Sequence, residues 1–178
     1  KGERILKLLE SYKNGLNERK INLDDDYIKF MRFAQWKLLE QGKKNLLDLA
    51  ENPRQGVMGF ITNSSFIWGR THRKMRESLY QSFDEIYILN LHGSDKDVKE
   101  DENVFDIKTG VSISIFIKHA TPLPEKKVRY FSTSDNNIFK RAEKFIFLQK
   151  NLSEIAWKSL EMQEPYYWFI DKVFDSEE

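Results

Sequence analysis

The sequence predicts an α/β fold in which a parallel strand is followed by an antiparallel pair of strands, with helices around the sheet. Residues 56–62 form an unbroken apolar run that stops on polar residues, the pattern of a strand covered by helices on both faces. Two further apolar strands are expected at 86–91 and 111–118, and the polar segment between them has no helical pattern. Because a parallel crossover normally needs a helix, these two strands should pair antiparallel.

Length and composition describe an ordinary folded domain rather than a disordered or fibrous chain. The 178 residues are 40% hydrophobic and 32% charged, with a formal net charge of +1, so overall charge identifies no partner. The absence of cysteine excludes disulfides, thiolate metal sites and cysteine nucleophiles. With neither a signal peptide nor a long uncharged apolar stretch, we expect a cytoplasmic protein without a membrane partner. The chain starts without Met, inside a charged helical pattern, and is expected to belong to a longer protein.

Helices are recognised by apolar residues spaced three and four apart. This spacing predicts helices at residues 5–12, 24–41, 43–55, 66–83 and 136–150. A break at Thr121–Pro124 and a further strand at 127–133 indicate a small α+β extension. We therefore expect two parts, residues 1–120 and residues 121–178. The aromatic run Tyr166–Phe169 is expected to be buried against the main body or a neighbouring part, with base stacking as the alternative.

Polar residues mark the carboxyl end of the first strand, where ligands bind in open α/β sheets. Asn63, Ser64, Ser65 and Phe66 occupy this position and are candidate binding residues. The alternative is that Asn63 and Ser64 only cap the following helix.

The densest basic cluster follows immediately. Its members are Arg70, His72, Arg73, Lys74 and Arg76. The cluster is either a solvated helix face or a set of contacts to DNA phosphates.

Several sequence blocks in one order resemble a known family. They are Gly-Phe-Ile-Thr-Asn-Ser-Ser-Phe at 59–66, the basic helix at 71–76, Tyr87–Gly93, Asp101–Ile107 and Gly110–Ile113. Together they resemble the N6-adenine DNA methyltransferase region of large single-chain restriction-modification enzymes. The resemblance extends to Asp25–Phe30 and, more loosely, to Pro165–Tyr167, so it spans about nine tenths of the chain.

The resemblance implies part of a Rossmann-like methyltransferase sheet. In the family, a glycine-rich loop holds S-adenosylmethionine and an Asn-Pro-Pro-Tyr motif holds the target amino group. This sequence has neither, since Asn52-Pro53-Arg54-Gln55 precedes a strand rather than following one. The chain therefore resembles the C-terminal half of the catalytic domain, after that motif. Alone it is expected to be inactive and to bind no cofactor, while the full-length enzyme would use S-adenosylmethionine. The implied partners are double-stranded DNA, the N-terminal half of the domain and a recognition domain of the same chain.

The resemblance also implies roles for the candidate residues. Methylation of an adenine inside a duplex requires that the base be extruded into a pocket. Residues 63–66 would line that pocket, and the loop with Asn103 and Phe105 would supply an aromatic ring against the base. The connection from Leu91 to Val111 is longer than an ordinary hairpin loop, which favours a functional role. Alternatively, Phe105 only anchors the loop to the core.

Two other functional classes are compatible with the sequence. Asp106-Ile107-Lys108 has the carboxylate-x-lysine spacing of a metal-dependent nuclease site, with Asp84 or Asp95 as a second carboxylate. The other class is a non-enzymatic module that binds DNA or protein.

Overall fold

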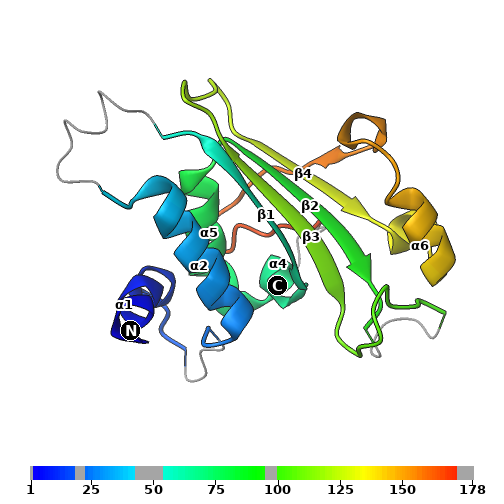
Figure 1. Cartoon of the computed structure of the whole chain (residues 1–178), viewed down its shortest axis with the longest axis horizontal. Helices are drawn as coiled ribbons and strands as arrows, with labels where there is room; N and C mark the ends of the chain where they lie inside the picture. The colour runs from blue at the N-terminus through cyan, green and yellow to red at the C-terminus, as the bar shows by residue number, and fades with distance from the viewer. Residues whose placement is uncertain (1, 19–22, 43–53, 95–99, 172–178) are drawn as a thin grey trace.

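A computed structural model describes residues 2–18, 23–42, 54–94 and 100–171. Five strands form one sheet in the order β1-β3-β2-β4-β5 (Figure 1). The strands are β1 (Gly56–Asn63), β2 (Glu85–His92), β3 (Val111–Lys118), β4 (Lys127–Ser132) and β5 (Lys158–Ser159). The predicted helix at 43–55 falls largely outside the described residues.

The predicted antiparallel pairing of the second and third strands is confirmed, with Glu85 opposite Ile117 and Leu89 opposite Ile113. The first strand needs a correction. Among the described residues β1 pairs only with β3, and this pairing is antiparallel. Since β3 is antiparallel to both β1 and β2, those two strands point the same way but are separated by β3. The parallel pair of the sheet is β2 with β4, and the extension contributes both β4 and β5 to the same sheet.

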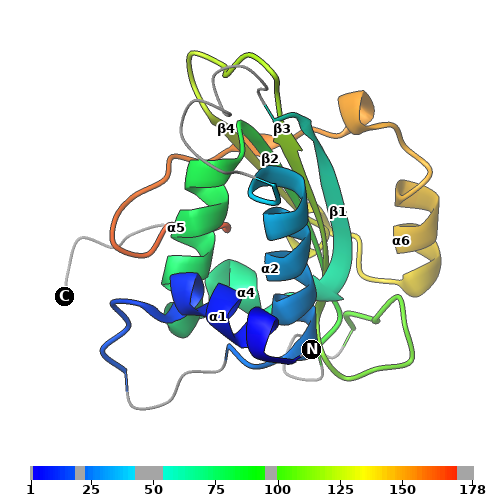
Figure 2. The ribbon, with the colours of Figure 1, turned by 60° about the vertical axis from the view of Figure 1, so that its left-hand side comes forward.

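Helices cover the two faces of the sheet unequally (Figure 2). Helices α1 (Gly2–Lys13), α2 (Asp26–Leu39) and α5 (Arg73–Ser82) lie on one side, and the shorter α6 (Arg141–Phe147) lies on the other. The main core joins the first side to the strands through residues such as Met31, Leu79 and Phe116. A smaller core, including Leu89, Phe131 and Phe147, lies under α6.

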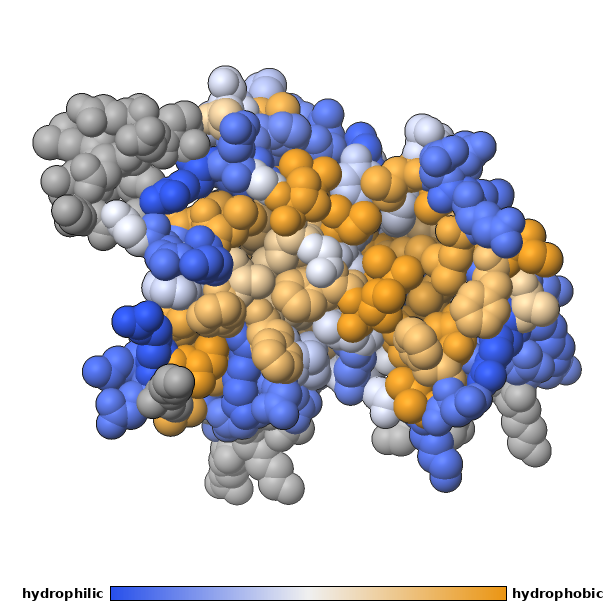
Figure 3. All heavy atoms as spheres, viewed as in Figure 1, coloured by the Kyte–Doolittle hydropathy of each residue, from blue (hydrophilic) through white to orange (hydrophobic). Residues whose placement is uncertain are grey.

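Strand β1 is not covered on both faces, contrary to the sequence prediction. Met58 and Thr62 are buried, whereas Val57 is 65% exposed and Ile61 is 57% exposed. Helix α2 covers the buried face. Figure 3 shows apolar residues gathered across the face of the molecule that Figure 1 presents.

The predicted helix at 66–83 is broken into three pieces. They are α4 (Ser65–Trp68), a 3-10 turn at Arg70–His72, and α5. The break falls at Gly69, whose backbone is extended (φ −68°, ψ 132°). A Cβ at this position would clash with the imidazole of His72 and lie 2.8 Å from the carbonyl oxygen of Ser65, so glycine permits the close turn.

The extension also differs in detail from the prediction. Helix α6 begins only at Arg141, because the Glu143 carboxylate accepts the backbone N–H of Lys140 (3.0 Å) and caps the helix there. The aromatic run is buried against the main body as expected, with Tyr167, Trp168 and Phe169 all below 10% exposure. The Phe169 N–H donates to the Ile67 carbonyl (3.1 Å). In the described part of the chain, no helix is long and apolar enough to cross a membrane.

Candidate functional site: a polar cavity at the strand ends

A cavity of about 600 Å³ lies at the carboxyl ends of β1, β2 and β4. Its walls come from α4, the residues just before β3 and the C-terminal segment as well as from the strands. The lining residues are Asn63, Ser64, Ser65, Trp68, Asn90, His92, Ser94, Lys108, Thr109, Gly110, Tyr130, Asp135, Ile170 and Asp171. Three of the four residues predicted from the first strand end, Asn63, Ser64 and Ser65, are therefore brought together here.

The β1 side of the cavity is built by a tight turn. The Asn63 side-chain oxygen accepts the Ser65 N–H (2.7 Å) and also bonds the Ser65 hydroxyl, so Asn63 starts α4 as well as facing the cavity. The Ser64 N–H donates to the Gly110 carbonyl (2.9 Å). A Cβ on Gly110 would lie 2.9 Å from the Ser64 hydroxyl, so glycine allows the two segments to meet. Phe66 does not line the cavity; it is fully buried, edge-on to Phe169.

The β2 and β4 side contributes polar groups that the sequence analysis missed. The Asn90 amide donates to the Tyr130 hydroxyl (3.3 Å), and its oxygen accepts the His92 N–H (3.2 Å). Burial raises the pKa of Tyr130 despite the opposing hydrogen bonds from Asn90 and Ser132, so the phenol keeps its proton. The signal in the sequence that could have indicated this side of the cavity was Asn90, a polar residue inside an otherwise apolar strand.

The loop before β3 is ordered by Asn103. The Asn103 amide donates to the carbonyl oxygens of Gly93 and Thr109 (both 2.8 Å), and its oxygen accepts the Phe105 N–H (2.9 Å). Phe105 is 46% exposed and does not line the cavity, although Lys108 and Gly110 of the same loop do. The described residues 100–110 of the long connection are thus held by hydrogen bonds and present an exposed aromatic ring.

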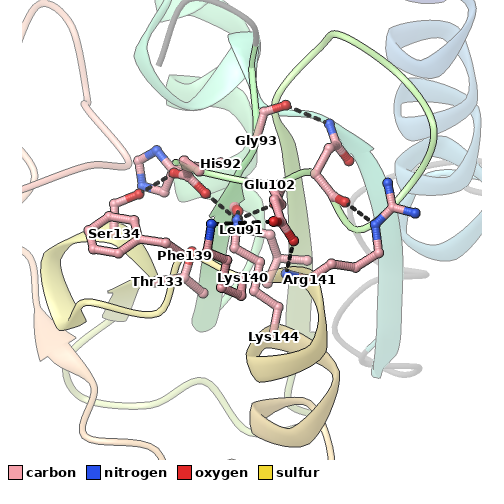
Figure 4. Close-up of polar contacts among 12 residues, drawn as sticks. Leu91, His92, Gly93, Glu102, Thr133, Ser134, Phe139, Lys140, Arg141 and Lys144 are labelled. Atoms are coloured by element: carbon pink, nitrogen blue, oxygen red, sulfur yellow. Dashed lines mark hydrogen bonds and ion pairs between the residues drawn. The ribbon is translucent and has the colours of Figure 1, made fainter. Parts of the chain in front are cut away.

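A buried ion pair supports this loop (Figure 4). Lys144 of α6 pairs with Asp101, and both side chains are fully buried. The ammonium also donates to the carbonyl oxygens of Leu91 and Glu102 (both 2.7 Å), and the Ser134 hydroxyl donates to Asp101 (2.6 Å). Four segments are therefore joined at one point, and the sequence analysis did not predict it.

The basic cluster is mostly turned inward or paired. Burial, with the nearby Arg76 charge, lowers the pKa of His72 to about 4, so His72 is neutral at physiological pH. Arg73 pairs with Glu18, and Lys74 pairs with Glu77 (2.6 Å). Arg70 is exposed.

Arg76 is fully buried and serves the fold. Its guanidinium donates to the carbonyl oxygens of Phe66 and Gly69 (both 2.7 Å) and to those of Tyr166 and Tyr167. It therefore ties the cavity-lining helix α4 to the C-terminal segment.

The carboxylates of the nuclease hypothesis do not meet. Asp84 precedes β2 and pairs with Lys118 (3.0 Å), whereas Asp106 follows the opposite end of β2 and pairs with Arg141 (2.8 Å). Asp95 lies outside the described residues. Within the described ranges, no three His, Asp or Glu side chains gather into a metal site.

The sequence resemblance associates S-adenosylmethionine with a glycine-rich loop. The turns after β1 and β2 begin Asn63-Ser64 and His92-Gly93, and neither is a glycine-rich loop.

The sequence matches no protein-family model and no curated protein sequence. The fold, however, matches solved structures, among them three that contain DNA. The cryo-EM structure of a DrdV–DNA complex has a TM-score of 0.79 and 24% identity, covering 98% of this chain and 16% of that one. The ATP-dependent Type ISP restriction-modification enzyme LlaBIII bound to DNA has a TM-score of 0.75 and 28% identity, covering 97% and 11%.

A nuclease-deletion mutant of the Type ISP enzyme LlaGI, in complex with a DNA substrate mimic, has a TM-score of 0.73 and 23% identity, covering 93% and 15%. The chain thus has the fold of a region found in restriction-modification enzymes. It spans between 11% and 16% of the length of these three chains.

Proposed function

We propose that this chain is the target-base-binding half of the catalytic domain of an S-adenosylmethionine-dependent DNA methyltransferase. The full-length protein would modify the N6 atom of adenine as part of a cytoplasmic restriction-modification enzyme. The observation that carries the proposal is the match over 97% of the chain to LlaBIII, an ATP-dependent Type ISP restriction-modification enzyme bound to DNA. The antiparallel pairing of β2 with β3 accords with the sheet expected from the sequence, whereas the place of β3 between β1 and β2 was not expected.

The cavity supports the proposed role in base binding. An extruded base is read by hydrogen bonds to its polar edge and by stacking. Asn63, Ser65 and Asn90 supply amide and hydroxyl groups to the cavity, and Phe105 presents an aromatic ring on the adjoining loop. Double-stranded DNA is therefore the proposed substrate.

The cofactor and the catalytic motif would come from other parts of the same protein. Among the described residues β1 is an edge strand on which Val57 and Ile61 are exposed, and Phe30 and Phe33 are exposed on α2. These features fit surfaces that another segment covers. We propose that the N-terminal half of the catalytic domain covers it, and that a separate recognition domain selects the DNA site. Sedimentation of the isolated chain should show self-association, and a monomer at all concentrations would argue against this docking surface.

The direct test uses the full-length enzyme, duplex DNA and S-adenosylmethionine with a labelled methyl group. Nucleoside analysis after digestion should recover the label on the N6 atom of adenine. Label on cytosine, or none on DNA, would overturn the proposal. In calorimetry, the 178-residue chain alone should show no binding of the cofactor, and micromolar binding would mean that its part in the domain is misassigned.

A further inference from the structure

Helix α6 holds the Phe105 loop from outside the cavity. The Arg141 guanidinium donates through Nε to the Asn103 carbonyl (2.7 Å) and through Nη2 to the Phe105 carbonyl (3.3 Å). The same Nη2 lies 2.8 Å from a carboxylate oxygen of Asp106. One side chain therefore contacts the loop before, at and after Phe105.

The part of α6 that carries Arg141 is also held in place. The Arg141 backbone N–H donates to the Glu102 carboxylate (2.9 Å), and Lys144, three residues further along α6, pairs with buried Asp101. Figure 4 shows Arg141 and Lys144 both directed from α6 toward the ends of the strands and the loop. Helix α6 and the loop therefore behave as one unit.

We propose that Arg141 is a positioning residue for Phe105: it fixes the backbone on which this ring meets an extruded base. The inference rests on the proposed function and assigns a task to the extension that follows the methyltransferase-like strands. Ordering a free loop costs conformational entropy for every residue that is fixed. A loop ordered before DNA arrives avoids that cost at the moment when the base is extruded. The planar guanidinium suits the task because it can reach two carbonyls and a carboxylate at once.

The competing explanation is a phosphate contact, since the Arg141 side chain is 42% exposed. The two explanations differ in salt dependence. Loss of a phosphate contact lowers the slope of affinity against salt concentration by about one counterion. Loss of a positioning contact leaves that slope unchanged. They also differ for Arg141→Lys. The ammonium of lysine can keep a contact with a phosphate, but it cannot reproduce the several directed hydrogen bonds of the planar guanidinium.

The test compares Arg141→Ala, Arg141→Lys, Phe105→Ala and the double variant Phe105→Ala/Arg141→Ala in the full-length enzyme. Lys140→Ala is the matched control, because Lys140 is the neighbouring cation, is 54% exposed and lies 3.4 Å from Glu102. Methylation is measured on a matched duplex and on one with a mismatched target adenine, which costs less to extrude. Fluorescence of 2-aminopurine at the target position reports extrusion, and binding is titrated at several salt concentrations.

We expect Phe105→Ala and Arg141→Ala each to slow methylation of the matched duplex by about five- to a hundred-fold. The mismatch should partly rescue both, and both should reduce the fluorescence of 2-aminopurine. The double variant should stay within about twofold of Phe105→Ala, because the two residues act on one contact. Arg141→Lys should resemble Arg141→Ala, and Lys140→Ala should resemble the unaltered enzyme.

Several outcomes overturn the inference. Additive losses in the double variant, a changed salt slope, or full activity of Arg141→Lys would assign Arg141 to a phosphate. A loss that the mismatch does not rescue would mean general damage to the fold. If Phe105→Ala shows the mismatch-dependent loss and Arg141→Ala behaves like Lys140→Ala, the inference alone fails. If Phe105→Ala methylates the matched duplex normally, the proposed role of Phe105 fails as well.

Discussion

The two walls of the cavity are each held by one buried cation, and the two cations are compensated in different ways. One wall is formed by α4 and supported from behind by Arg76 of α5, and is called the α4–α5 wall. There the hydrogen bonds of Arg76 go to carbonyl oxygens, those of Phe66, Gly69 and two residues of the C-terminal segment. On the loop wall, Lys144 has the Asp101 carboxylate as well as two carbonyls. Both cations join segments that lie far apart in the sequence.

The difference concerns what is left behind when the cation is removed. Burial and the nearby Arg73 charge lower the pKa of Arg76 to about 9, so the guanidinium keeps its charge at neutral pH without a carboxylate. Removal of the Arg76 side chain leaves backbone carbonyl oxygens without their hydrogen-bond donor. Removal of Lys144 leaves the full negative charge of Asp101 buried without its cation, which costs more stability than unpaired dipoles do. The loop wall should therefore depend more strongly on its cation than the α4–α5 wall does.

The largest effect is expected for Lys144→Met, which should lower the free energy of unfolding by about 3–5 kcal/mol because Asp101 stays buried without a partner. Denaturant unfolding measures the loss. The double variant Lys144→Met/Asp101→Asn is the control: the amide removes the charge and still accepts the Ser134 hydroxyl, so most of the stability should return. If the double variant is as unstable as Lys144→Met alone, packing rather than charge explains the loss.

For Arg76→Met we expect a smaller loss of about 2–4 kcal/mol, since several carbonyls lose their donors but no charge is stranded. The same unfolding experiment applies, with Arg70→Met as the matched exposed control, which should change stability by less than about 0.5 kcal/mol. An Arg76→Met loss larger than that of Lys144→Met would reverse the proposed order of the two walls.

His72 makes the α4–α5 wall sensitive to acid. Its pKa is lowered from 6.5 to about 4 in the folded chain, so below pH 6.5 the unfolded chain binds a proton that the folded chain does not. The stability that His72 contributes is therefore present above pH 6.5 and is lost as the pH falls toward 4. We expect a loss of about 1–3 kcal/mol over this window. Carboxylates titrate there too, so the measurement is the difference between the unaltered chain and His72→Gln, whose profile should be flatter.

The sequence predicted local structure well where one pattern decided it. Apolar spacing located α1, α2 and the first four strands, and the missing helix between residues 91 and 111 predicted the antiparallel pairing of β2 with β3. Pattern alone did not reveal that β3 lies between β1 and β2, because strand order depends on contacts distant in sequence. It also assigned two covered faces to β1, since an apolar run does not say which face a neighbour covers.

The site was only partly predictable for the same reason. Asn63, Ser64 and Ser65 lie at the carboxyl end of a strand, so the sequence alone was enough to predict them as binding residues at that end. Tyr130 and Asp135 reach it only through the parallel pairing of β4 with β2. The sequence also did not show which basic side chains point inward. A run of basic residues predicts an exposed surface, yet Arg76 and His72 are buried by packing against the C-terminal segment and Gly69.

The smallest effect is expected for DNA contacts on the α4–α5 wall, measured in the full-length enzyme. Phosphate contact was one of the two interpretations of the basic cluster, whose members besides buried Arg76 are Arg70, His72, Arg73 and Lys74. Of these, Arg73 and Lys74 are already engaged by Glu18 and Glu77, and His72 is neutral, so exposed Arg70 is the best placed. Arg70→Ala should weaken binding by less than about tenfold on any duplex and lower the salt slope by about one. Arg73→Ala should change the slope less, since Glu18 already neutralises that charge. The reverse order would mean that Arg73 exchanges Glu18 for a phosphate when DNA binds, and the α4–α5 wall would then be rearranged by DNA rather than prepared for it.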